Sequence, residues 1–363
     1  MKTLRVKLDK RSYPIIVGEG VIRRAGQLLA GVGFASPPVI VTNSTVWRLH
    51  GEDLRRSLSA AFGPCAVIRI GDGERFKNHE TLERIYGGLF QAHADRRSWI
   101  LAFGGGVIGD IAGFAAATFL RGIPYASVPT TLLAQVDSSI GGKVGINVTR
   151  GKNLIGAFHQ PSAVLSDTSV LRTLPTRELA SGLFEVVKCG AIRSRSLLRF
   201  LERELPAIQS CMAGPLEYIV VEASRIKAQV VSGDEREDEL RMILNYGHTV
   251  GHALEAATAY RRFKHGEAVG WGMVAALEFG RELGMLQPAD VQRLTRLICR
   301  VEDLPSLRGI RIEDVWRALK RDKKFRAGNI RMVLLPHLGE TEIVSGIDPA
   351  ALRRFLKGFL ISA

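Results

Sequence analysis

Short apolar runs alternate with amphipathic helical patterns along the first half of the chain. The apolar runs predict buried strands at residues 37–42, 66–70 and 98–103, each bounded by turn residues. The amphipathic stretches predict helices at residues 44–62 and 77–94. Because strands and helices alternate over this length, we expect a mostly parallel sheet covered by helices.

The pattern becomes helical near Thr176. Helices are predicted at residues 177–192, 196–209, 215–231, 248–260 and 266–284. Strand character returns weakly at residues 330–336, whereas the runs at 4–8 and 13–18 predict a small antiparallel pair beside the first sheet. A chain of 363 residues is longer than the usual limit for a single hydrophobic core. We therefore expect an α/β N-terminal domain with a mostly parallel sheet, residues 1–175, and an all-helical C-terminal domain, residues 176–363.

The composition is that of a globular protein, with 46% hydrophobic residues and a formal net charge of +14. The arginines are spread over predicted helix surfaces without an aromatic-interleaved basic motif, so nucleic-acid binding is not expected. No run approaches the about 20 apolar residues of a membrane span, and the N-terminus lacks the pattern of a secretory signal. The four cysteines show no C-x-x-C spacing, which favours free thiols and a cytoplasmic location.

Three glycines with the spacing G-x-G-x-x-G, Gly104, Gly106 and Gly109, directly follow the third predicted strand, and a helical pattern begins just after Asp110. In this context the loop suits a pyrophosphate at a helix N-terminus. No acid lies about 20 residues further on to hold a ribose, as that fingerprint requires. Glu74, beyond an earlier strand, is the alternative ribose ligand. The simpler interpretation is a tight strand-to-helix turn without a ligand.

Residues 129–161 combine glycines, small hydroxyl residues, one acid and two lysines. Such a stretch is poor material for a packed core, but it lets a backbone approach a phosphorylated, hydroxyl-rich ligand closely. Lys143 and Lys152 can each supply a point charge for phosphate, and Asp137 can bind hydroxyl groups.

A group of histidines predicts a metal site. His248 and His252 are four residues apart and share one helix face, and His265 opens another predicted helix. Glu185 lies in the middle of a predicted helix. A Glu-His-His set can hold zinc or a similar divalent ion and leave positions open for substrate. The alternative is that these are ordinary surface or core histidines; the spacing is not H-E-x-x-H, so a zinc protease is not expected.

Five motifs resemble those of the 3-dehydroquinate synthase family: in order, GGGVIGDIAGFAAATFLRGIPY, VPTTLLAQVDSSIGGKVGIN, GKNLIGAFHQP, LASGLFEVVKCGAI and LNYGHTVGHALE. The resemblance covers roughly residues 10 to 340. It implies a nucleotide-binding N-terminal α/β domain, a helical C-terminal domain that binds metal and substrate, and a homodimer. It also implies NAD, one divalent metal (zinc or cobalt) and a heptulosonate phosphate substrate.

The resemblance assigns roles to residues in the matching motifs. The implied metal ligands are Glu185, His248 and His265. The implied NAD contacts are Glu74, Lys77, Gly105, Gly106, Asp110, Thr130, Thr131 and Lys152. The implied substrate contacts are Arg121 (reaching into the partner's site), Asp137, Lys143, Asn153, Lys188, Lys227, Arg241, Asn245 and Lys324 (chosen over Lys323). The implied catalytic set is Lys143, Asn153, Arg241, Glu237 as proton acceptor, and His252 near the leaving phosphate.

The implied reaction converts 3-deoxy-D-arabino-heptulosonate 7-phosphate to 3-dehydroquinate and phosphate, in the shikimate pathway. NAD transiently oxidises a hydroxyl, phosphate is eliminated, the hydride returns, and ring opening with an aldol step closes the product. Three alternatives stay open: a sugar phosphate cyclase whose substrate has no carboxylate, a metal-dependent polyol dehydrogenase, and a nucleic-acid-binding protein with a decayed site. Lys227 with Arg241 favours a carboxylate, and residues 129–161 argue against a simple dehydrogenase.

Overall fold

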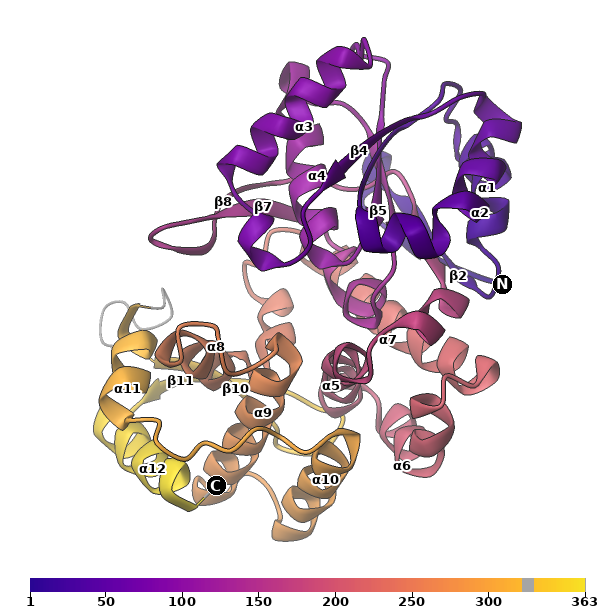
Figure 1. Cartoon of the computed structure of the whole chain (residues 1–363). Helices are drawn as coiled ribbons and strands as arrows, with labels where there is room; N and C mark the ends of the chain where they lie inside the picture. The colour runs from indigo at the N-terminus through magenta and orange to yellow at the C-terminus, as the bar shows by residue number, and fades with distance from the viewer. Residues whose placement is uncertain (322–329, 363) are drawn as a thin grey trace. The chain divides into compact units, whose positions relative to one another are not determined.

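The computed structural model describes residues 1–321 and 330–362. These residues form two compact units (Figure 1). One unit comprises Met1–Pro175 and Cys211–Arg236, and the other comprises Thr176–Ser210 and the residues from Glu237 onward.

The first unit is built on a seven-stranded sheet with the order β1-β2-β9-β6-β5-β3-β4. Its strands are β1 (Lys2–Val6), β2 (Tyr13–Gly18), β3 (Val39–Asn43), β4 (Ala66–Ile70), β5 (Ile100–Gly104), β6 (Tyr125–Pro129) and β9 (Val164–Asp167). β1 pairs antiparallel with β2, and the other neighbours pair in parallel. The predicted mostly parallel sheet and its antiparallel N-terminal pair are therefore confirmed. The pattern misses β6 and β9, because their short apolar runs are interrupted by the buried Ser127 and Ser166.

Helices cover both faces of this sheet. α1 (Ala25–Val32) and α2 (Ser44–Phe62) lie on one face, and α3 (His79–Gln91) and α4 (Gly106–Thr118) lie on the other (Figure 1). Val39 and Val41 of β3 belong to the apolar cluster under α3 and α4, as alternation along a strand requires. The predicted helices at 44–62 and 77–94 are confirmed as α2 and α3.

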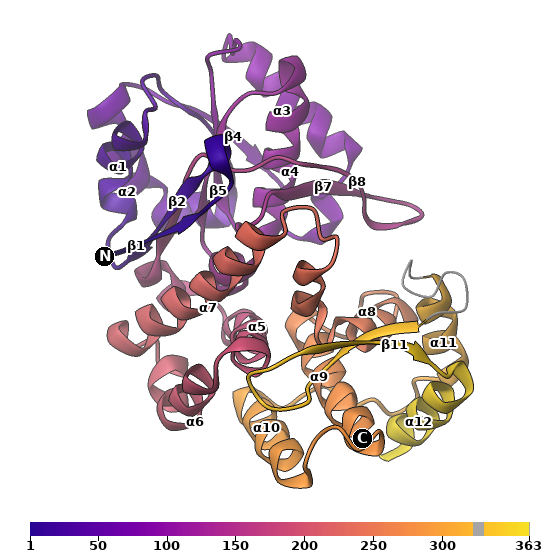
Figure 2. The same ribbon diagram turned by 180° about the vertical axis from the view of Figure 1, so that it is seen from behind.

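Two further elements complete the first unit. The hairpin β7 (Lys143–Val148) and β8 (Gly151–Phe158) contributes Val144 and Ile146 to the same apolar cluster. α7 (Ala213–Gly233) packs against β1 and β2 (Figure 2). The predicted domain limits, 1–175 and 176–363, instead place α7 among the C-terminal helices. Those limits stay a prediction about which segments fold together.

The second unit is helical apart from one hairpin. Its helices are α5 (Thr176–Arg193), α6 (Arg195–Gln209), α8 (His248–Ala257), α9 (His265–Glu282), α10 (Pro288–Val301), α11 (Ile312–Arg321) and α12 (Pro349–Ser362). The hairpin of β10 (Ile330–Leu334) and β11 (Glu342–Ile347) departs from the expected all-helical domain. Only β10 leaves a strand signal in the sequence, because β11 is a mixture of exposed and half-buried residues.

Short 3-10 helices lie at Asp9–Arg11, Ile22–Arg24, Glu74–Phe76, Phe119–Arg121, Thr168–Thr173 and Leu240–Asn245, and a π-helical turn lies at Ala134–Ser138. Among the described helices, none combines the length and the apolar character that crossing a membrane requires.

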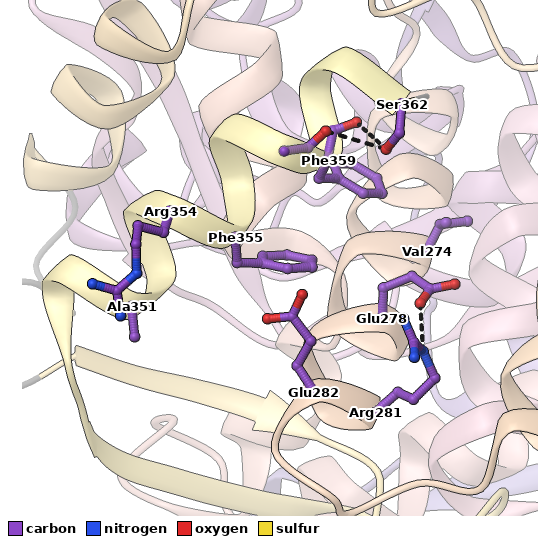
Figure 3. A pocket seen from close by; sticks show the side chains of 10 residues that line it. Val274, Glu278, Arg281, Glu282, Ala351, Arg354, Phe355, Phe359 and Ser362 are labelled. Carbon is purple, nitrogen blue, oxygen red and sulfur yellow. Dashed lines mark hydrogen bonds and ion pairs between the residues drawn. The ribbon is translucent and has the colours of Figure 1, made fainter.

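A groove runs between α9 and α12 in the second unit (Figure 3). Phe355 and Phe359 of α12 stack on each other within it, and Glu278 forms an ion pair with Arg281 at its edge. Of the described residues that the sequence assigns to NAD, metal or substrate, none lines this groove.

Candidate active site

The glycine-rich loop joins β5 directly to α4. Gly105 caps α4 and Gly106 is its first residue, so the helix begins before Asp110 rather than after it, where the sequence pattern predicts its start. A Cβ atom at Gly105 would lie 3.0 Å from Cγ2 of Thr131, and one at Gly106 would lie 2.9 Å from Oγ of Ser138. Glycine therefore allows close packing of the loop, and the helix start that it opens presents backbone N–H groups of the kind that bind phosphate.

A buried lysine lies beside α4. The side chain of Lys77 is 4% exposed, and its ammonium contacts the carboxylate of Asp110 and Oδ1 of Asn153. Nδ2 of Asn147 donates a hydrogen bond to the carboxylate of Glu74 at 2.7 Å. The structure thus joins the predicted NAD residues Lys77 and Asp110. It also joins Lys77 to Asn153, which the resemblance assigned to substrate.

The segment 129–161 contains the π-helical turn and the β7–β8 hairpin as well as loops. Lys143 is the first residue of β7 and is exposed, whereas Lys152 is half-buried next to Asn153 in β8. The part of this stretch that carries Lys143 and Lys152 is therefore a pair of strands, which holds these lysines at defined positions along a regular backbone.

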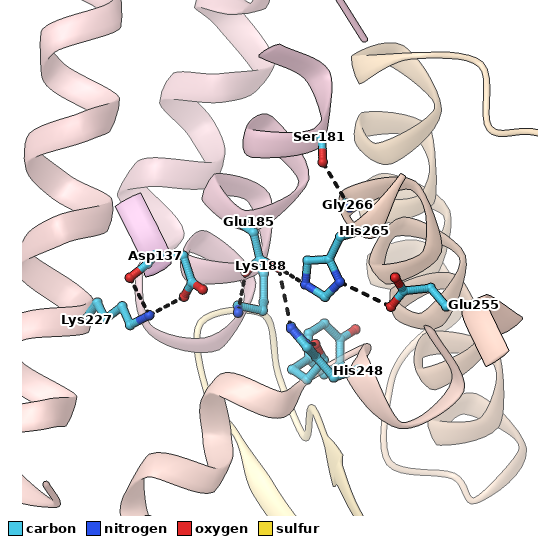
Figure 4. A network of polar contacts seen from close by, with 10 residues as sticks. Asp137, Ser181, Glu185, Lys188, Lys227, His248, Glu255, His265 and Gly266 are labelled. Atoms are coloured by element: carbon cyan, nitrogen blue, oxygen red, sulfur yellow. Dashed lines mark hydrogen bonds and ion pairs between the residues drawn. The ribbon is translucent and has the colours of Figure 1, made fainter. Parts of the chain in front are cut away.

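Asp137 and Lys227 form a close pair within the first unit. The Lys227 ammonium donates to the carbonyl oxygen of Asp137 at 2.7 Å and to its carboxylate at 2.5 Å (Figure 4). The chain itself thus supplies an anion for Lys227. Lys227 by itself is therefore no evidence for a substrate carboxylate.

Glycine also shapes the second unit, where α8 and α9 approach closely. A Cβ atom at Gly272 would lie 1.8 Å from the carbonyl oxygen of Gly247. Gly247 itself has a φ of 78°, a left-handed conformation that favours glycine. The close approach lets the first residue of each helix, His248 and His265, face the same carboxylate.

That carboxylate belongs to Glu185, in the middle of α5 as predicted (Figure 4). Oε1 of Glu185 lies 3.5 Å from Nε2 of His248 and 3.6 Å from Nε2 of His265. Glu185 is 1% exposed and forms an ion pair with Lys188. Among the described residues, its carboxylate accepts no hydrogen bond of ordinary geometry. A buried carboxylate facing two imidazole nitrogens is a donor set suited to a divalent metal.

His252 lies beside the same cluster. Its ring centroid is 5.2 Å from that of His248 and 5.7 Å from that of His265. The nitrogen ligand atoms of these three histidines lie within 4.8 Å of one another. The geometry therefore offers a second possible ligand set, three histidines, which differs from the implied set by exchanging Glu185 for His252.

The Nδ1 atoms of His248 and His265, which point away from Glu185, also have polar partners. Nδ1 of His248 lies 3.1 Å from the carbonyl oxygen of Tyr246, and Nδ1 of His265 lies 3.2 Å from Oε2 of Glu255. Such contacts fix the tautomer and orient Nε2 toward a metal. Glu255 is not among the predicted site residues, although it follows His248 by seven residues on α8 and so shares its face.

The electrostatics agree with this donor set. Burial, with the Lys188 ammonium as a second cause, holds the pKa of His248 well below its ordinary value. The imidazole of His248 is therefore neutral near pH 7, which is the form that binds metals. With one carboxylate and two imidazoles, the residues fit a zinc-like ion.

Further predicted substrate residues precede α8. Arg241 is 2% exposed within the 3-10 helix Leu240–Asn245. Nδ2 of Asn245 donates to Oε1 of Glu237 at 2.7 Å, which fixes the predicted proton acceptor against a predicted substrate ligand. Glu237 has a φ of 66°, a conformation that non-glycine residues rarely adopt and that often marks functional positions.

The remaining predicted residues lie at turns. Arg121 ends the 3-10 helix after α4 with a φ of 72° and is exposed. Thr130 is buried directly after β6, and Oγ1 of Thr131 accepts the backbone N–H of Ala134 at 3.1 Å. Lys324 and its alternative Lys323 lie outside the described residues.

A parallel strand joined by a glycine loop to a helix N-terminus is typical of dinucleotide-binding enzymes, and a Glu-His-His cluster around a buried carboxylate is typical of enzymes that bind a divalent metal. The chain belongs to the 3-dehydroquinate synthase family: the N-terminal family model matches residues 67–181 and the C-terminal model matches residues 182–325. It is 48% identical over 358 residues to the 3-dehydroquinate synthase of Pelotomaculum thermopropionicum, across 98% of this chain and 96% of that one.

Two solved structures share the fold over nearly their whole lengths. A 2-deoxy-scyllo-inosose synthase complexed with carbaglucose-6-phosphate, NAD⁺ and Co²⁺ is 26% identical, with a TM-score of 0.88 over 98% of this chain and 100% of that one. A 2-epi-5-epi-valiolone synthase from Streptomyces hygroscopicus, with NAD⁺ and Zn²⁺ bound, is 27% identical, with a TM-score of 0.89 over 98% and 99%. The predicted fold class is thereby confirmed.

Proposed function

We propose that this chain converts 3-deoxy-D-arabino-heptulosonate 7-phosphate to 3-dehydroquinate and phosphate, as a lyase of aromatic amino acid biosynthesis. The observation that carries the proposal is the convergence of Glu185, His248 and His265 in a family member 48% identical to a 3-dehydroquinate synthase. The solved relatives hold NAD⁺ with Co²⁺ or Zn²⁺, which supports NAD and one divalent ion, zinc or cobalt, as cofactors here.

Two groups of residues hold these cofactors in the proposal. NAD contacts Glu74, Lys77, Gly105, Gly106, Asp110, Thr130, Thr131 and Lys152. The divalent ion binds Glu185, His248 and His265. When bound, NAD takes up and returns a hydride, and the ion polarises the reacting oxygen.

The chain's other residues bind substrate and manage charge. Lys143, Asn153, Lys324 and the partner's Arg121 hold phosphate, whereas Lys188, Lys227 and Arg241 hold the carboxylate and nearby oxygens. An arginine can grip a carboxylate through two parallel hydrogen bonds. Asp137 and Asn245 orient hydroxyl groups, the Glu237 carboxylate accepts a proton, and His252 stands near the leaving phosphate. Positioning and charge stabilisation are the main contributions of such a protein.

A homodimer is part of the proposal. Leu154, Ile155 and Phe158 of β8 are 61%, 39% and 47% exposed, which is unusual for three apolar side chains so close in one strand. A second copy that covers them would remove this apolar surface from water. A cytoplasmic location also belongs to the proposal, which includes no nucleic-acid or membrane partner.

Phosphate release from matched substrates tests the function. Zinc-loaded protein with NAD is given 3-deoxy-D-arabino-heptulosonate 7-phosphate, sedoheptulose 7-phosphate or glucose 6-phosphate. We expect rapid phosphate release from the first only, because it alone carries a carboxylate for Arg241 and Lys188. Release from either of the other two, with none from the first, would make the chain a cyclase of another specificity.

The contact of Glu255 with His265 predicts an effect on metal affinity. Replacing Glu255 by alanine is expected to weaken zinc binding about 10- to 100-fold, because the ligand loses the carboxylate that orients it. Glu255→Gln keeps an acceptor for Nδ1 and should lose less. Competition with a chromophoric chelator measures the affinity. Glu278→Gln on α9, which removes a surface carboxylate paired with Arg281, is the control and should bind zinc normally; equal affinities for Glu255→Ala and this control would contradict the role.

A further inference from the structure

Asn147, near the end of β7, ties two parts of the first unit together. Its backbone N–H donates to the carbonyl oxygen of Lys77 at 2.7 Å, and its Nδ2 donates to the carboxylate of Glu74 at 2.7 Å. Its Oδ1 accepts the backbone N–H of Asn153 at 3.0 Å. One residue therefore fastens the segment that follows β4 to the start of β8.

Lys77 makes a second link to the same strand. Its buried ammonium contacts Oδ1 of Asn153 as well as the carboxylate of Asp110. Asn153 has a φ of 55°, in the left-handed region that asparagine tolerates better than most residues. The backbone N–H of Asn153 is thus held by Asn147 and its side chain by Lys77, so that both neighbours restrain its position.

This linked group borders open space. Glu74, Lys77, Asn147 and Thr149 line one pocket of the first unit. A ligand that enters this pocket meets Glu74 and Lys77, whereas Asn153, in β8, is bonded to Asn147 and to Lys77. The side-chain bonds of Asn147 therefore join Glu74, at the pocket, to the backbone of Asn153.

We propose that Asn147 is a positioning residue that couples the binding of NAD to the binding of the phosphorylated substrate. The inference rests on the proposed function, in which Glu74 and Lys77 contact NAD and Asn153 contacts the substrate phosphate. A ligand that orders Asn153 also orders Glu74 through the side chain of Asn147, in addition to the direct contact of Asn153 with Lys77, so that the second ligand meets residues already in place. Such coupling is reciprocal between the two ligands and typically amounts to about 5- to 150-fold in affinity.

The test measures NAD affinity in zinc-loaded protein with and without a phosphonate analogue of the substrate, whose C–P bond cannot be eliminated. Isothermal titration gives the dissociation constant of NAD in each state, and their ratio is the coupling. For the unsubstituted protein we expect NAD to bind at least about 5-fold more tightly when the analogue is present.

Two substitutions separate the bonds of Asn147. Asn147→Ala removes both side-chain bonds, so we expect weaker NAD binding and a coupling ratio reduced at least threefold, to about 1 to 2 if the unsubstituted ratio is near the lower limit. Asn147→Asp keeps the acceptor for Asn153 but places a carboxylate against Glu74. We expect this variant to bind NAD more weakly while its coupling stays within about twofold of that of the unsubstituted protein.

Ser57→Ala is the control. It removes a side-chain hydrogen bond to the backbone N–H of Gly26, at 3.0 Å, elsewhere in the same unit, and should leave both NAD affinity and coupling unchanged. An unchanged coupling ratio in Asn147→Ala, or a ratio of 1 in the unsubstituted protein, would overturn the inference while leaving the proposed function intact. If the unsubstituted protein did not bind NAD at all, the proposed function would fall as well. Zinc content, measured in every variant, shows that the second unit is intact.

Discussion

Replacing His248 by alanine is expected to remove the metal and to lower turnover by about a thousandfold or more, since a bound ion contributes several kcal/mol of charge stabilisation to such a reaction. Nε2 of His248 lies 3.5 Å from the buried Glu185 carboxylate, and its other ring nitrogen is held by the Tyr246 carbonyl. Without this imidazole, the proposed ligand set is reduced to the Glu185 carboxylate and His265. Elemental analysis after dialysis against equimolar zinc measures the occupancy.

Substitutions of two other histidines provide a control and distinguish between the two possible ligand sets. His337 is exposed in the same unit, so His337→Ala should keep full zinc occupancy. His252→Ala should also keep zinc, because the contacts to Glu185 come from His248 and His265. Loss of zinc from His252→Ala, with zinc retained in Glu185→Ala, would replace the proposed set by the three-histidine set.

Replacing Lys143 by alanine is expected to lower kcat by about 10²- to 10³-fold, the cost of removing one preorganised charge-stabilising donor from an active site. Lys143 opens β7 with an exposed side chain, and its backbone pairs with Phe158 across the hairpin, so the substitution leaves the strand pairing in place. The dissociation constant of NAD should stay within about twofold, because the lysine is proposed to serve the substrate phosphate. Steady-state kinetics and NAD titration give the two quantities.

Arg150 provides the matched control for charge. It lies exposed in the turn between β7 and β8, so Arg150→Ala removes one positive charge from the same hairpin. Its turnover should match that of the unsubstituted protein. Equal losses in the two variants would mean that the general field of the hairpin, rather than Lys143 itself, acts on the substrate; normal turnover of Lys143→Ala would remove this residue from the site.

The strands that could be predicted are those buried on both faces. Such strands form continuous apolar runs, as in β3 and β5, whereas the edge strand β4 keeps an apolar run on one buried face only. The β7–β8 hairpin could not be predicted, since its glycines suggest a loop. Gly145 and Gly156 are paired across the hairpin, and a Cβ atom at Gly156 would lie 2.2 Å from the carbonyl oxygen of Val144. Here glycine allows two strands to approach, which composition alone does not reveal.

Some residues of the candidate site could likewise be predicted from the sequence, and others could not. The spacing of His248 and His252 predicts their shared helix face, and the ring centroids lie 5.2 Å apart as that spacing requires. Asn147 had no such local signal, because its partners Glu74 and Lys77 lie far away in the chain and meet it only through the fold. Lys227 likewise has a partner that the sequence does not reveal, the Asp137 carboxylate, and its role as a substrate ligand stays a prediction.

The most direct test of the account is the stoichiometry of phosphate to NAD in a single reaction. Zinc-loaded protein is given 3-deoxy-D-arabino-heptulosonate 7-phosphate in large excess over NAD, and phosphate, NADH absorbance and product are followed together to completion. A redox-neutral cyclase releases one phosphate per substrate over many turnovers for each NAD, forms 3-dehydroquinate, and leaves no net NADH. Accumulation of one NADH per substrate, or phosphate release that stops at one per NAD, would contradict the account.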